Sequence, residues 1–127
     1  MSSRYTFEKK EKLCSKLTIS ALFKSGKSFK EYPIRVIYLP LSESDAAAKL
    51  LISVPKKRFK KAVTRNKIKR QIRETYRLNK PEIIEDWQAR GKYFALAFVY
   101  IGSDIPEYRD LHAVMKRILE KLNSLSA

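Results

Sequence analysis

One basic segment, residues 56–80, constrains this chain more than any other feature. It reads KKRFKKAVTRNKIKRQIRETYRLNK and contains 12 of the 28 Lys and Arg residues but only one of the 13 acids, so it carries +11 of the formal net charge of +15. Between residues 62 and 78 it has no Gly or Pro, and Ile68, Ile72 and Tyr76 recur every four residues. This pattern predicts an amphipathic helix with a buried apolar stripe.

The cations of this helix gather beside its apolar stripe. On a helical wheel of about 100° per residue, an arc adjoining the stripe contains Arg65, Asn66, Lys69, Arg70, Arg73 and Arg77. Lys67 falls outside that arc. Like charges four residues apart, such as Arg65 and Lys69, destabilise a helix by a few tenths of a kcal/mol per pair. A sequence that keeps this repulsion along one face favours a polyanionic partner over a face that is merely solvated.

The order of residues in this segment carries a resemblance. The runs VPKK (residues 54–57) and AVTRNKIKRQIRE (residues 62–74) closely resemble the signature of the bacterial ribonuclease P protein component, V-x-K-K followed by A-V-x-R-N-R-x-K-R-x-x-R-E. One position departs, because Lys67 stands where the pattern has the second Arg of R-N-R. Lysine keeps the charge but replaces a planar, two-pronged donor with a point charge.

The resemblance implies a function and a set of site residues. In that family an RNA subunit carries out the Mg²⁺-dependent hydrolysis that releases the 5′ leader of precursor tRNA, while the protein binds both the RNA subunit and the leader. The matching RNA-facing residues are Lys56, Lys57, Arg65, Asn66, Lys67, Lys69, Arg70 and Arg73. The family also holds the leader in a cleft between the first helix and one sheet face, and the matching positions there are Ile19, Phe23 and Tyr38.

Composition agrees with a small globular protein. The 127 residues are a common length for one domain, and 44% hydrophobic and 11% aromatic residues argue against disorder. We therefore expect a single RNA-binding domain, residues 1–127, that is monomeric when isolated. There is no apolar run of about 20 residues for a membrane span, no apolar signal-peptide core and only one cysteine, so we expect a cytoplasmic protein without a membrane partner.

Periodicity along the chain predicts a two-layer α+β domain of order α-β-β-α-β-α, with helices packed on a small sheet. Residues 1–15 are expected to be an irregular lead-in that Phe7 and Leu13 can pin to the body. A first helix, 16–25, ends at Gly26. The expected strands are 32–39, 49–54 and 93–101, the first two as antiparallel neighbours, and a last helix begins near Pro106 with an apolar stripe that includes Tyr108.

The crossover around the basic helix can be predicted in two ways. General rules of chain topology favour a right-handed βαβ connection. The family resemblance implies the uncommon left-handed sense, which we therefore expect.

No catalytic or metal-binding motif can be recognised in the sequence. His112 is the only histidine, and no Ser/His/Asp, Cys/His, zinc-spaced or Gly-rich phosphate-binding pattern occurs. The resemblance therefore assigns Mg²⁺ to the RNA-containing holoenzyme. Two other functions stay open: a basic RNA- or ribosome-associated protein without a role in tRNA processing, and a stand-alone nuclease. The ordered basic run argues against the first, and the missing acid, base or metal set argues against the second.

Overall fold

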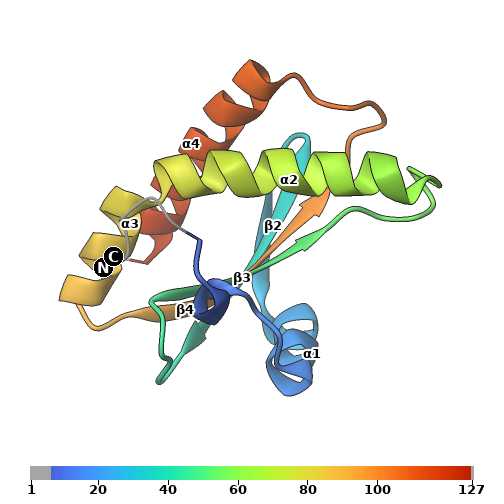
Figure 1. The fold of residues 1–127 in the computed structure, drawn as a ribbon. Helices are drawn as coiled ribbons and strands as arrows, with labels where there is room; N and C mark the ends of the chain where they lie inside the picture. Colours follow the sequence, from blue (N-terminus) through green and yellow to red (C-terminus); the bar gives the residue numbers. More distant parts are fainter. Residues whose placement is uncertain (1–6, 127) are drawn as a thin grey trace.

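The structure, a computed structural model, describes residues 7–126. Along the chain these residues form η1 (Lys9–Glu11, a 3₁₀ turn), α1 (Lys16–Ser25), β1 (Lys27–Glu31), β2 (Ile34–Leu41), β3 (Ala48–Ser53), α2 (Ala62–Asn79), α3 (Pro81–Ala89), β4 (Tyr93–Tyr100) and α4 (Tyr108–Leu125) (Figure 1). The strands form one sheet in the order β1-β2-β4-β3, with β3 parallel to β4 and the other pairs antiparallel. The predicted α+β class is confirmed.

The pairing of the strands differs from the prediction. The two strands expected to be antiparallel neighbours, β2 and β3, are separated by β4. β4 is apolar on both faces, as in its run YFALAFVY, which suits a strand with neighbours on either side. The antiparallel partner that precedes β2 is β1, whose polar sequence KSFKE lacks the apolar alternation by which strands are recognised.

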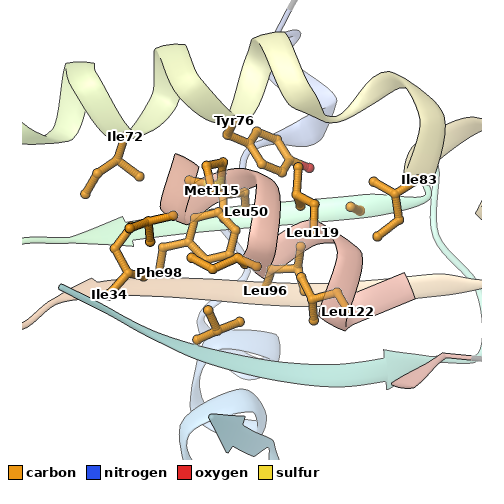
Figure 2. Close-up of a cluster of buried hydrophobic side chains, with 14 of the residues drawn as sticks. Ile34, Leu50, Ile72, Tyr76, Ile83, Leu96, Phe98, Met115, Leu119 and Leu122 are labelled. Atoms are coloured by element: carbon orange, nitrogen blue, oxygen red, sulfur yellow. The ribbon is translucent and has the colours of Figure 1, made fainter. Parts of the chain in front are cut away.

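Helices α2, α3 and α4 bury the main core against one sheet face (Figure 2). Ile72 and Tyr76 of α2 and Met115 of α4 are fully buried there. Strand residues such as Val36 and Phe98 supply the sheet side of this core. The last helix begins at Tyr108 rather than Pro106, and Tyr108 is exposed, so its expected place in the apolar stripe is wrong.

Helix α1 packs on the opposite sheet face, below the sheet in Figure 1. Its fully buried Leu22 meets a second apolar cluster that includes Ala95 and Ala97 of β4, whose small side chains leave room for the helix. Gly26 ends α1 as predicted, but at a φ of −69°. Its smallness is what matters, because a Cβ there would lie 2.3 Å from the carbonyl oxygen of Leu22.

The lead-in is attached at both predicted points within the described residues. Phe7 packs edge-on against Tyr76 with ring centroids 6.0 Å apart, and Leu13 is buried in the cluster beneath α1. Residues 1–6 of the predicted irregular lead-in lie outside the described residues. The handedness of the crossover from β3 through α2 to β4 stays a prediction.

Candidate nucleic-acid interface

The exposed face of α2 is the first part of the site. Ile68, Ile72 and Tyr76 are fully buried, which fixes the rotation of the helix against the core. The outward-facing residues that follow from this rotation are Val63, Asn66, Lys67, Arg70 and Arg73, all of them exposed. This face therefore offers three cations and an amide along about three turns of helix.

The structure places Lys67 on the exposed face of α2. Lys67 is exposed on the same outer face as Asn66 and Arg70, although the wheel left it outside the cationic arc. Arg65 and Lys69, which the wheel placed within the arc, are half-buried on the flank of the helix. The cationic arc and the exposed face therefore differ, because exposure depends also on the segments that lie against each flank of the helix.

The segment between β3 and α2, residues 55–61, is the second part of the site, and we name it the basic turn. The carbonyl of Pro55 accepts hydrogen bonds from the backbone N–H groups of Arg58 (3.2 Å) and Phe59 (3.3 Å). The ring of Phe59 packs against Tyr100 at a centroid distance of 5.9 Å. Five cations of the turn are exposed: Lys56, Lys57, Arg58, Lys60 and Lys61.

Three of these cations were missed by the sequence analysis. Only Lys56 and Lys57 match the family signature, so Arg58, Lys60 and Lys61 were counted in the charge but not assigned to the site. The sequence did contain a signal for them, because the run KKRFKK places five cations around a single Phe. Because Phe59 anchors the turn in the core, all five cations surround one short, folded segment.

The carboxylate of Glu74 neutralises one member of the predicted arc. Its Oε1 accepts a hydrogen bond from Nη2 of Arg77 at 2.5 Å. That hydrogen bond holds the pKa of Glu74 below its usual value and raises the pKa of Arg77. Both groups stay charged at neutral pH, and Arg77 is the arc residue whose charge is already balanced within the protein.

The structure does not bring the three predicted cleft residues together. Ile19 and Phe23 lie on α1, and half of the Phe23 side chain is exposed. Tyr38 packs on the main core with Phe29, at a centroid distance of 6.1 Å, on the sheet face opposite to α1. Grouping Tyr38 with the other two is therefore wrong. Side chains alternate along a strand, so the neighbouring Ile37 is the β2 residue that meets α1.

The described residues offer no recognisable metal centre. Within residues 7–126, no three His, Cys, Asp or Glu side chains lie close enough to hold a metal ion. His112 is half-buried and its Nε2 lies 3.4 Å from Nδ2 of Asn79. Cys14 is exposed and free.

Comparison with known proteins identifies the family. A family model described as Ribonuclease P matches residues 7–123. A Porphyromonas gingivalis protein named Ribonuclease P protein component is 40% identical over 125 residues, which are 96% of this chain and 91% of that protein. The chain belongs to the ribonuclease P protein family. A family member of the same name from Dictyoglomus turgidum is 34% identical over 116 residues, or 91% of this chain and 89% of that one.

Solved structures of ribonuclease P proteins share this fold. The Staphylococcus aureus RNase P protein superposes with a TM-score of 0.71 at 22% identity, over 88% of this chain and 94% of that one. The RNase P protein from Thermotoga maritima superposes with a TM-score of 0.69 at 24% identity, over 87% of this chain and 96% of that one. With the family model and the curated relatives above, the predicted family is confirmed. Between residues 7 and 126, no helix is both long enough and apolar enough to cross a membrane.

Proposed function

We propose that this chain is the protein subunit of ribonuclease P, which binds the catalytic RNA subunit and the 5′ leader of precursor tRNA and assists removal of the leader. The observation that carries the proposal is the continuous exposed surface made by the outer face of α2 and the basic turn. Its cations, on a chain of net charge +15, suit the closely spaced phosphates of folded RNA.

In this proposal the protein supplies binding and the RNA supplies the chemistry. Mg²⁺ supports phosphodiester hydrolysis in the RNA-containing holoenzyme. The exposed cations reduce the repulsion between the phosphates of the RNA subunit and those of precursor tRNA when the two RNAs associate. Asn66, which lies among them, can donate hydrogen bonds through its amide and accept them as well. We place this activity in the cytoplasm, and we propose that the isolated chain is a monomer.

The leader-binding part of the proposal rests on α1. Phe23 is half exposed, and Ile19 lies one helical turn before it. Aromatic rings stack with unpaired bases at about 1–3 kcal/mol per base, whatever the sequence. Ile19 has no ring and adds apolar contact only. In this revised assignment Tyr38 is not part of the leader site, because it lies on the other sheet face.

A binding measurement tests the RNA partnership. The affinity of the chain for a bacterial ribonuclease P RNA is measured across a series of salt concentrations, against a second folded RNA of equal length. The proposal predicts a steep salt dependence for both RNAs, because phosphate contacts are shared, and a tighter complex with ribonuclease P RNA at every salt concentration. Equal affinity for the two RNAs would favour a general RNA-binding protein instead.

A further inference from the structure

Arg65 of α2 donates hydrogen bonds to the backbone of the basic turn, within the candidate interface. Its Nη1 donates one hydrogen bond to the carbonyl of Phe59 and another to the carbonyl of Lys60, both at 2.8 Å. A guanidinium Nη carries two hydrogens, so both donors of this nitrogen are used within the protein. The side chain is half-buried, in contrast to the exposed Asn66 beside it.

The two carbonyls belong to the basic turn, whose folded conformation is opposed by charge repulsion and by a weak helix N-cap. The basic turn places five exposed cations within six residues, and their mutual repulsion opposes a compact conformation. Helix α2 follows at once, and Lys61 at its N-cap position provides no side-chain hydrogen bond to the first turn. Lysine is a poor N-cap, because it lacks the oxygen that accepts a hydrogen bond from the free N–H groups there.

The other anchors of the basic turn lie before its last two cations. The Pro55 carbonyl holds the N–H groups of Arg58 and Phe59, and the Phe59 ring is packed against Tyr100. Between Phe59 and the start of α2, the carbonyls of Phe59 and Lys60 accept the two hydrogen bonds that the Arg65 side chain donates. The Arg65 side chain thus connects the second turn of the helix to the segment that precedes it.

We propose that Arg65 is a positioning residue that fixes the basic turn against α2, so that Lys60 and Lys61 are held beside the exposed face of the helix before RNA binds. The proposal rests on the proposed function, because it assigns to the RNA-binding surface a preformed shape. It differs from the reading of Arg65 as one more phosphate contact. Its substitution should disturb several cations at once, whereas substitution of an outer residue such as Arg70 removes one.

The first test needs no RNA. Amide hydrogen exchange is measured in the isolated protein for wild type, Arg65→Ala, Arg65→Lys and the control Arg70→Ala. Arg65→Ala should speed exchange at the N–H groups of Arg58 and Phe59 by about tenfold or more, because local opening becomes easier. Exchange in α4 should not change, which excludes global unfolding. Unaltered exchange at Arg58 and Phe59 would overturn the proposal.

Arg65→Lys separates geometry from charge. The lysine retains the positive charge but replaces the planar fork with one flexible ammonium group. The proposal predicts faster exchange in the basic turn for Arg65→Lys than for wild type, although less than for Arg65→Ala. If Arg65→Ala does not fold, Arg65→Lys alone decides the question. Exchange identical to wild type in Arg65→Lys would show that charge alone is required there.

The second test uses ribonuclease P RNA. One lost phosphate contact lowers the slope of log affinity against log salt by about 0.7–0.9. Arg70→Ala should lower this slope by about that amount. Arg65→Ala should lower it by more, because the turn no longer presents its cations together. A decrease in slope for Arg65→Ala no larger than that for Arg70→Ala would contradict the proposal. If exchange responds as predicted but the RNA is not preferred over its control, the positioning role stands and the proposed function fails.

Discussion

Lys80 and Glu11, 69 residues apart in the sequence, form a buried ion pair. The Nζ of Lys80, between α2 and α3, donates a hydrogen bond to Oε1 of Glu11 in η1, and their side chains are only 5% and 11% exposed. The same ammonium group lies 5.8 Å from the centre of the Phe7 ring. This pair ties the lead-in to the end of the basic helix. It lies apart from the exposed cations and has a structural role.

Breaking this pair on one side should destabilise the protein strongly. Glu11→Ala leaves the Lys80 charge buried without its partner, and such losses cost about 3–5 kcal/mol. The double variant Glu11→Leu/Lys80→Met should recover most of this, because it removes both charges and keeps apolar volume. Urea unfolding measures each free energy. The exposed neighbour Lys10 is the control, and Lys10→Ala should cost less than about 1 kcal/mol. Equal effects of Glu11→Ala and Lys10→Ala would contradict the structural role.

Tyr76 should make the protein sensitive to alkali. Its buried hydroxyl has no hydrogen-bond partner among the described residues. Burial, and then the Glu11 carboxylate, raises the pKa of Tyr76 above its ordinary value of 10.0. Because the folded pKa is the higher one, titration of Tyr76 leaves the free energy of unfolding unchanged below pH 10 and lowers it as the pH rises further, since the unfolded tyrosine ionises first. Tyr76→Phe should match or exceed wild-type stability at pH 7.

The alkaline effect is measured as a difference between variants. Urea unfolding at pH 8 to 11 should show a shallower loss of stability for Tyr76→Phe than for wild type. Lysines also titrate in this range, so Tyr108→Phe, which changes an exposed tyrosine, serves as the reference. Parallel stability curves for all three proteins would show that the Tyr76 hydroxyl is not shielded as the structure implies.

Arg70 should contact RNA directly. It is exposed on the outer face of α2, and Arg70→Ala should lower the slope of log affinity against log salt by about 0.7–0.9. Lys116→Ala is the matched control, because Lys116 is an exposed cation on α4. Its removal should leave the slope nearly unchanged. Identical slopes for the two variants would mean that RNA is attracted by net charge and not by the α2 surface.

Phe23 should matter only for substrates with a leader. Phe23→Leu keeps apolar volume and removes the ring, so the holoenzyme should bind precursor tRNA more weakly by about 1–3 kcal/mol if one base stacks there. Its affinity for mature tRNA should not change. Tyr38→Leu removes a ring from the other sheet face and should leave the ratio of the two affinities unaltered. Circular dichroism checks that both variants fold. An unaltered ratio for Phe23→Leu would assign Phe23 to a structural role.

Local patterns explain the parts of the fold that the sequence predicted. The apolar stripe of α2 and the glycine after α1 depend on residues within a few positions of one another, and both were confirmed. The place of β4 between β2 and β3 depends on contacts between distant segments, for which period-two alternation carries no information. The exposure of Lys67 and the inward turn of Arg65 depend likewise on what packs beside the helix.

The aromatic assignment failed for a related reason. Tyr38 matched the family by residue type. Its alternation with Ile37 along β2 indicated only that these two side chains lie on opposite faces of the sheet. The sequence could not say which face α1 would cover. In the structure, Ala95 and Ala97 provide the shallow surface on which α1 rests, and their strand is paired with β2 through non-local contacts.

Cleavage of precursor tRNA at low Mg²⁺ shows directly whether this chain works as the protein subunit of ribonuclease P. A bacterial ribonuclease P RNA is incubated with precursor tRNA at a Mg²⁺ concentration too low for efficient cleavage by the RNA alone, with and without the purified chain. The account predicts that the chain restores release of the 5′ leader, and that the chain without RNA releases none. Failure to restore cleavage, although the chain is folded and binds the RNA, would contradict it.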